Sequence, residues 1–169
     1  YVSDFHEIRI VSDSSYYVLG REIVILDLSS TVPGGRRDVQ VVSAVIEERT
    51  FSGNTLFLWR SIEHIPVTDA SETIDLTASA IDYIHINSIA IASDGNLLLS
   101  CRHLSEVIKV NRATGEIMWR LGGSDSKNNQ FTFLNDTKDG YVGFSFQHSA
   151  AETADGTLLL FDNGNTKPT

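Results

Sequence analysis

Three of the five histidines in this 169-residue chain stand at matching points of a repeated pattern. His85 precedes an apolar run, an Asp-Gly pair at Asp94 and a run of three leucines, and His148 precedes the same pattern at Asp155. His6 begins a third copy, in which the aspartate keeps the interval seen after His148 but the glycine is absent. Because equivalent points of repeats arranged around a centre converge on one axis, these histidines are candidates for a single site.

The residue types around these histidines favour the chemistry of an anion. A neutral imidazole is a nucleophile and a general base near pH 7. Asn87 is expected on the same face as His85 because side chains alternate along a strand. Arg102 follows a predicted strand, and its planar guanidinium matches oxyanions. His64 and His103 lie outside the repeat, and His64 is expected to be structural.

The segments that must position these residues are predicted to be strands. Short runs rich in Val, Ile, Leu and Tyr alternate with Gly, Asp, Asn and Ser, which predicts an all-β fold. Asp-Gly pairs at Asp94 and Asp155 predict hairpin turns, where glycine accepts a positive φ. Helical periodicity over ten or more residues appears only in Glu72–Ile84. The predicted strands are Tyr16–Gly20, Glu22–Leu28, Val39–Glu48, Leu56–Trp59, Ser88–Ala92, Leu97–Cys101, Val107–Val110, Glu116–Trp119 and Thr157–Phe161.

The repeat continues downstream, where Val-Ile, Gly and Trp-Arg recur in order, ending at Trp59 and again at Trp119. A repeating four-stranded unit is typical of a β-propeller blade. We expect one incomplete propeller domain over residues 1–169. Its blade-like units lie at roughly 1–60, 85–120 and 148–169, with long loops near 27–38 and 61–82. Propellers usually close with about 4–8 blades, so about two and a half blades predict that further blades are missing from this chain.

Composition excludes several classes of partner. A net charge of −9 argues against a nucleic acid or an anionic membrane, which attract a surplus of Lys and Arg. The apolar runs are far shorter than the roughly 20 residues of a membrane helix, so no membrane span is expected. Cys101 is the only cysteine, which excludes an intrachain disulfide and a cysteine-based zinc cluster. No signal peptide opens the chain, which is expected to be a processed product or a fragment.

Several strings resemble the arylsulfotransferase family in both order and spacing. They are Asp82–Ile89, Asp94–Arg102, Val107–Gly123, Phe146–Ala150 and Leu160–Asn165. Leu58–Pro66 is similar to the linker that precedes the His-x-Asn-Ser motif in the same family. The resemblance covers nearly the whole chain and is strongest from Trp59 to Asn165.

This resemblance implies a six-bladed propeller that moves a sulfuryl group from an aryl sulfate to a phenol without the nucleotide donor PAPS. The family's Gln-His motif makes His148 the nucleophile that forms a transient sulfohistidine. The His-x-Asn-Ser motif makes His85 and Asn87 the groups that hold the sulfuryl oxygens, and Arg102 the arginine that neutralises them. His6 is similar to the remaining histidine, which assists the phenolic oxygen. The scheme needs no cofactor and no metal, and the family favours a periplasmic or secreted location.

Three alternatives remain open. Each histidine could instead cap its own strand through a hydrogen bond to a neighbouring turn. The three histidines could bind zinc and leave a fourth position for water, as in a hydrolase or lyase, although the sequence offers no carboxylate in register with them. The chain could also belong to a non-catalytic propeller that binds or scaffolds a partner.

Overall fold

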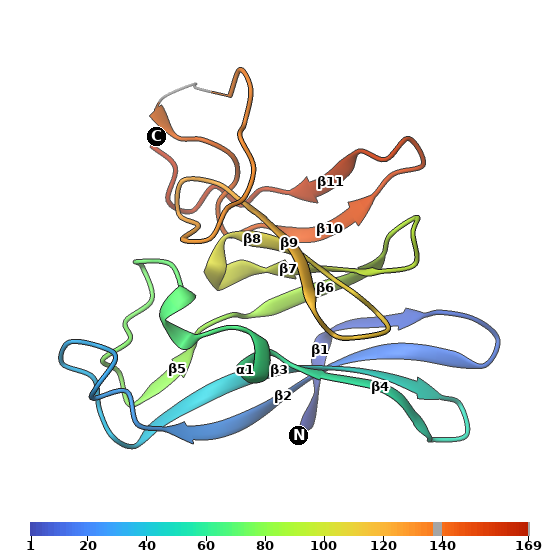
Figure 1. Cartoon of the computed structure of the whole chain (residues 1–169), viewed down its shortest axis with the longest axis horizontal. Coiled ribbons are helices and arrows are strands. Elements are labelled where there is room, and N and C mark those ends of the chain that lie inside the picture. The colour runs from blue at the N-terminus through green and yellow to red at the C-terminus, as the bar shows by residue number, and fades with distance from the viewer. Residues whose placement is uncertain (137–139, 169) are drawn as a thin grey trace.

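The structure, a computed structural model, describes residues 1–136 and 140–168 and is all-β (Figure 1). The first sheet runs in the order β1 (Val2–Ile10), β2 (Ser15–Leu26), β3 (Val39–Thr50) and β4 (Thr55–Arg60). Each of these strands is antiparallel to the next, and β5 (Ala80–Asp82) adds to β3 in parallel.

Two further sheets follow in the chain. The second is the antiparallel sheet of β6 (Ile86–Ile91), β7 (Leu97–Cys101), β8 (Glu106–Val110) and β9 (Ile117–Gly122). The third pairs β10 (His148–Glu152) with β11 (Leu158–Phe161). The helices are short: α1 (Ser61–His64), η1 (Val67–Asp69) and η2 (Arg102–Leu104). No helix among the described residues is long and apolar enough to cross a membrane.

The hairpin turns follow the predicted glycine chemistry. Gly95 joins β6 to β7 and Gly156 joins β10 to β11, each with a φ of 82°. Such a φ is sterically free only for glycine, so the Asp-Gly pairs select these turns. The strand order and the absence of a closed barrel from the described residues agree with the predicted partial propeller.

The helical periodicity of Glu72–Ile84 does not produce a helix. The segment forms turns and then the strand β5. The Asp75 carboxylate accepts hydrogen bonds from the backbone N–H of Thr77 at 2.9 Å and from its hydroxyl at 2.6 Å. Side chains that bond the nearby backbone in this way compete with helix formation. The buried Ile81 then packs in the core beside β3.

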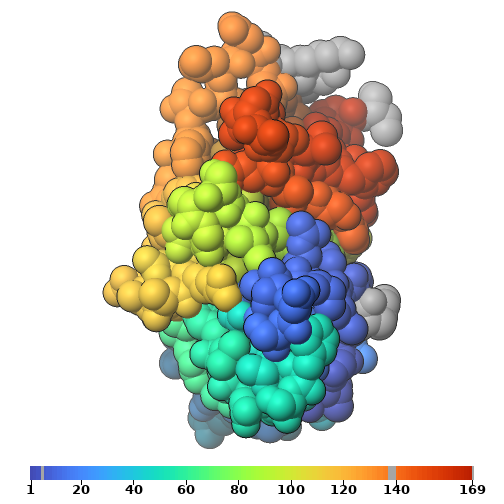
Figure 2. All heavy atoms as spheres, turned by 90° about the vertical axis from the view of Figure 1, so that its right-hand side faces the viewer, coloured from blue at the N-terminus to red at the C-terminus, as the bar shows by residue number. Residues whose placement is uncertain are grey.

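The three sheets lie in layers with an apolar core between each neighbouring pair (Figure 1). In the space-filling view, the first sheet lies at the bottom in blue and teal and the third sheet at the top in red (Figure 2). Leu97 and Leu99 join the core shared with the first sheet, whereas Leu98 joins the core shared with the third. Alternation along β7 therefore supplies both faces of the central sheet with leucine. Burial on both faces explains why this strand is a continuous apolar run.

The two repeated tryptophans lie on the outer strands β4 and β9, and each packs in the core on the side of the next sheet. Trp59 is fully buried and donates from Nε1 to the Gly115 carbonyl at 3.0 Å, which ties the first sheet to a turn of the second. Its ring stacks on His64 with centroids 4.9 Å apart, so His64 has a structural contact. Trp119 packs against the core between the second and third sheets.

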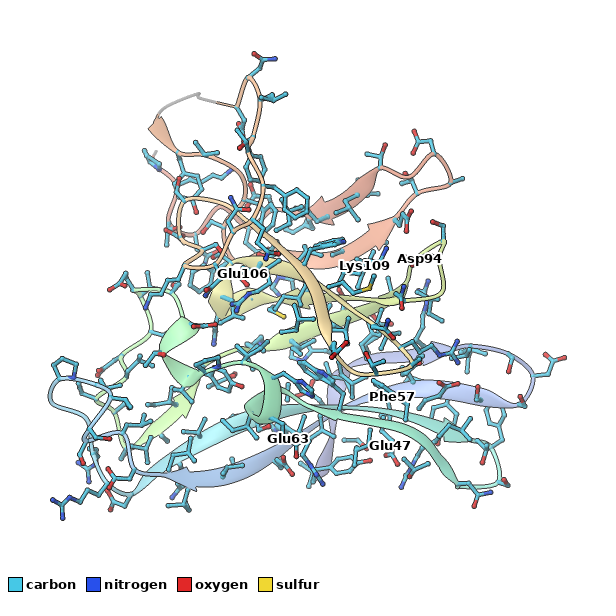
Figure 3. The ribbon with its side chains drawn as sticks, viewed as in Figure 1. Glu47, Phe57, Glu63, Asp94, Glu106 and Lys109 are labelled. Atoms are coloured by element: carbon cyan, nitrogen blue, oxygen red, sulfur yellow. The ribbon has the colours of Figure 1, made fainter. Side chains whose placement is uncertain are left out.

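Ion pairs also join the sheets. Glu48 of β3 is 3% exposed and pairs with Arg112, from the turn after β8, at 2.7 Å. Lys109 and Asp94 form a 2.7 Å pair at the edge of the second sheet, where the two side chains point toward one another (Figure 3). The first pair is between sheets and has a buried carboxylate, while the second is within one sheet and has an exposed one.

Candidate active site

The three repeated histidines stand at the beginnings or within the first strands of the three sheets. His6 lies in β1, His85 comes directly before β6, and His148 is the first residue of β10. Strand β6 lies beside both β1 and β10 (Figure 1). All three strands break register near their histidine, between Ser3 and Ile8, between Ile86 and Ser88, and between His148 and Ala151. Such irregularities redirect side chains and are common beside active sites.

The backbone next to the site is also unusual. His85 has a φ of 46° and Ser149, directly after His148, has a φ of 56°. Residues with a side chain rarely adopt this left-handed conformation, which costs free energy and persists where the surroundings impose it. One such position is His85 itself and the other directly follows His148, so the backbone at both histidines is held by its surroundings.

His6 and His85 share one pocket. Their rings meet edge to face with centroids 5.1 Å apart. His6 Nδ1 bonds the carboxylate of Asp4, and His85 Nδ1 bonds the carboxylate of Asp82 at 2.6 Å. The pocket between them is walled by aliphatic side chains of β2 and β3, including Leu19. His6 and His85 therefore each have a carboxylate on Nδ1.

Asp82 also meets a further histidine. His103 Nδ1 donates to the Asp82 carbonyl oxygen at 2.5 Å, and its ring lies 4.7 Å from that of His85. Burial alone would raise the pKa of Asp82, but the hydrogen bond from His85 and the two imidazoles outweigh it and hold that pKa below its ordinary value. Asp82 is therefore the carboxylate around which His85 and His103 are arranged.

Arg102 completes this side of the site. Its Nη1 donates to His103 Nε2 at 2.8 Å, and its guanidinium carbon lies 4.7 Å from the centre of the Phe146 ring. The backbone N–H of Arg102 donates to the His85 carbonyl at 3.0 Å, which extends the pairing of β6 with β7. The end of β7 thus delivers a fixed positive charge beside His85.

His148 has a neutral partner instead of a carboxylate. Its Nδ1 lies 3.2 Å from Oδ1 of Asn163. Burial lowers the pKa of His148 below its ordinary value, and the charges of Arg102 and His85 act in the same direction, against the hydrogen bond to Asn163. Because the pKa responds to Arg102 and His85, His148 belongs to the same electrostatic environment. It is a half-buried imidazole whose neutral form is favoured.

Asn87 links β6 to the segment that leads into β10. Its side chain is buried, and Nδ2 donates to the Gln147 carbonyl at 2.9 Å. Gln147 in turn donates from Nε2 to the Glu106 carbonyl at 2.7 Å. This chain of contacts fixes the residue directly before His148 against the second sheet.

Sequence reasoning missed three groups at this site: Asp4, Asp82 and His103. Asp4 and Asp82 stand two and three residues before His6 and His85, so they do not occupy matching positions of the repeat, and His148 faces Asn163 instead of a carboxylate. A tight turn folds Asp82 back onto the His85 backbone N–H at 3.1 Å. The signal was present in the sequence as an aspartate close before His6 and before His85, and as the Arg102-His103 pair. Repeat register alone did not select them.

Asp82, His85 and His103 also have ligand atoms within 4.8 Å of one another, as a metal site would require. Their donors are already engaged, however. Both Nδ1 atoms bond Asp82, and His103 Nε2 accepts a hydrogen bond from Arg102. A guanidinium is permanently charged and would repel a cation at this point. The donor set therefore fits an anion better than a metal ion.

Comparison with known proteins gives one kind of match. The family model described as arylsulfotransferase (ASST) matches residues 1–169. Neither the curated proteins nor the solved structures gave a match to the chain.

Proposed function

Since the chain belongs to the arylsulfotransferase family, we propose that it carries the active site of a PAPS-independent sulfotransferase. The site takes a sulfuryl group from an aryl sulfate onto a histidine and passes it to a phenol. The observation that carries this proposal is the row of ring contacts from His6 to His85 and from His85 to His103, with the Arg102 guanidinium bonded to His103. A guanidinium beside several imidazoles suits an anionic group that must be bound and then attacked.

His148 is the nucleophile. Because Asn163 Oδ1 accepts a hydrogen bond, His148 bears its proton on Nδ1 and keeps a lone pair on Nε2. That nitrogen forms a bond to sulfur while the bond from sulfur to the aryl oxygen breaks, and the phenolate leaves. In the second step the acceptor oxygen bonds to sulfur, the N–S bond breaks, and the phenolic proton passes to a neighbouring base.

Arg102 stabilises the transferred group. The sulfuryl oxygens carry negative charge throughout the transfer, and fixed donors aimed at that charge lower the barrier, as in phosphoryl transfer. The contacts of Arg102 with His103 and Phe146 support this role, because they hold the guanidinium before substrate arrives. We assign Asn87 the role of a further donor to the sulfuryl oxygens through the second N–H of its amide.

His85 and His6 exchange the proton with the phenolic oxygens. A carboxylate that accepts from Nδ1 stabilises the imidazolium formed when Nε2 takes a proton, which is the arrangement used in catalytic triads. Asp82 supplies this for His85, and Asp4 supplies it for His6. One histidine protonates the leaving phenolate, and the same group deprotonates the incoming phenol.

The experiment is a transfer assay on the purified full-length protein with 4-nitrophenyl sulfate as donor and phenol as acceptor, without nucleotide. We expect release of 4-nitrophenolate that depends on phenol, together with phenyl sulfate detected by mass spectrometry. Transfer only in the presence of PAPS, or no transfer from any aryl sulfate, would overturn the proposal.

A zinc-dependent reaction is the alternative to be tested, because Asp82, His85 and His103 lie close together although their hydrogen bonds and Arg102 do not favour a cation. In such a reaction a zinc ion would activate water. Metal analysis of the purified protein and assay after chelation separate the two functions. The sulfohistidine scheme predicts full activity after chelation, whereas a zinc reaction predicts loss of activity and recovery when zinc is restored.

A further inference from the structure

His103 has both ring nitrogens bonded to groups whose hydrogen-bonding character is fixed. The Asp82 carbonyl oxygen can only accept, so Nδ1 at 2.5 Å must carry a hydrogen. The Arg102 guanidinium can only donate, so Nε2 at 2.8 Å must present a lone pair. His103 is therefore the neutral tautomer with its hydrogen on Nδ1.

The surroundings oppose any other state of this ring. A protonated His103 would set an N–H on Nε2 against an N–H of Arg102, with two positive charges in contact. Burial lowers the pKa of His103, with Arg102 and His85 acting in the same direction and Asp82 against them. The Phe146 ring covers another side at 5.9 Å and offers no charge, and the side chain is 14% exposed.

We propose that His103 is the positioning residue of Arg102. Its Nε2 holds one guanidinium nitrogen while Phe146 supports the flat face, so the remaining N–H donors are aimed at the anionic group. This inference rests on the proposed role of Arg102 in binding the sulfuryl oxygens. Asp82 fixes the tautomer on which the arrangement depends.

Asp82 thereby contacts two imidazoles through different groups, His85 through its carboxylate and His103 through its backbone carbonyl. The Asp82 side chain prepares His85 to take a proton, whereas its backbone carbonyl keeps the His103 proton on Nδ1. Because the carbonyl is uncharged, it orients His103 without favouring the imidazolium as strongly as a carboxylate does. Within this neighbouring pair of histidines, we assign proton exchange to His85 and the positioning of Arg102 to His103.

The first test measures the tautomer directly by NMR of the histidine ring nitrogens. The His103 signals are assigned by their loss in His103→Gln. We expect a neutral ring protonated on Nδ1 that titrates only below the ordinary histidine range. A ring protonated on Nε2, or titration at or above the ordinary pKa, would overturn the inference whether or not the protein is a sulfotransferase.

The second test is a double-mutant cycle on kcat/KM for 4-nitrophenyl sulfate and on the Kd of inorganic sulfate. His103→Phe keeps the ring packing but removes both hydrogen bonds. Because Arg102 then lacks one acceptor, kcat/KM should fall and the Kd of sulfate should rise, each roughly 10- to 100-fold. His103→Gln offers an amide oxygen to Arg102, so most of the loss should be recovered. His64→Phe is the matched control and should leave both quantities unchanged.

A residue that acts only through Arg102 gives a coupled cycle. His103→Phe should therefore have little further effect in an Arg102→Met background. An equal loss with and without Arg102 would show a general structural role and overturn the inference. Coupled sulfate binding without aryl sulfate turnover would sustain the inference and overturn the proposed function, so the two failures are distinguishable.

Discussion

The histidines of the site occupy equivalent places but have different chemical partners. Nδ1 of His85 faces a carboxylate, and so does Nδ1 of His6, whereas Nδ1 of His148 faces the neutral amide of Asn163. A carboxylate stabilises an imidazolium, and a neutral acceptor does so far less. This difference between the partners is the basis on which we propose proton exchange for His6 and His85 and the nucleophilic role for His148.

Arg102 gives the first prediction at this scale. Arg102→Ala leaves His148 in place but removes the fixed charge, so kcat should fall roughly 10²–10³-fold, as when one oxyanion donor is removed. Arg102→Lys should recover activity only in part, because an ammonium lacks the planar fork that contacts His103 and Phe146. Steady-state kinetics with 4-nitrophenyl sulfate measure both variants, and His64→Ala is the control. Full activity in Arg102→Ala would remove Arg102 from the mechanism.

The second prediction concerns the pH dependence of kcat/KM. Because the pKa of His148 is lowered, its neutral nucleophilic form persists to lower pH than for an ordinary histidine. Activity lost on protonation of the nucleophile should therefore decline only below a pH of about 6.5 as the solution is acidified. A pH–rate profile measures this limb. A decline beginning above the ordinary histidine pKa would contradict the nucleophile's neutral environment.

At the scale of elements, the sheets are joined by polar contacts as well as by apolar packing. Arg112 pairs with the buried Glu48 across the first two sheets, so Arg112→Met should leave this carboxylate with only the Ser15 and Tyr17 hydroxyls as side-chain donors and lower the free energy of unfolding by about 2 kcal/mol. Lys109→Met breaks the more exposed pair with Asp94 and should cost less than about 1 kcal/mol. Denaturant titration compares them. An equal decrease in the free energy of unfolding for both variants would show that burial of the Glu48 carboxylate does not require Arg112.

Most elements could be predicted from the sequence because their signals are local. Alternating apolar runs and Asp-Gly pairs fix the strands and turns of the second sheet within a few residues. The Glu72–Ile84 pattern misled because short-range bonds from Asp75 compete with a helix. For the candidate site, the sequence repeat selects three histidines and their role stays a prediction. His103 and Asp82 were not selected, because they meet only where the end of β7 pairs beside the start of β6.

At the scale of the whole molecule, the first sheet has an outer face whose centre is buried at Val18 and Glu47 and whose edges carry exposed apolar side chains. Ile8, Val18, Glu47 and Leu58 form one row across four strands, and their neighbours Tyr17 and Glu48 turn toward the second sheet. The ends of the row, Ile8 and Leu58, are 64% and 42% exposed. We propose that a further blade covers this face in the complete propeller. The division of residues 1–169 into blades of one domain stays a prediction.

Leu58→Glu tests that proposal in the full-length protein. If a blade packs on this face, the buried carboxylate should lower the free energy of unfolding by more than about 2 kcal/mol. Leu134, in a loop and 81% exposed, is the control, and Leu134→Glu should change stability by less than about 0.5 kcal/mol. Thermal or denaturant unfolding measures both. Equal, small changes would mean that the outer face meets solvent.

The sulfohistidine on His148 is the central claim, and intact-mass spectrometry tests it most directly. The full-length protein is incubated with 4-nitrophenyl sulfate without acceptor, quenched, and weighed beside folded His148→Ala and His64→Ala variants. We predict one added sulfuryl group on the wild type and on His64→Ala, lost when phenol is added, and none on His148→Ala. A sulfuryl adduct on His148→Ala, or phenol sulfation by that variant, would contradict the account.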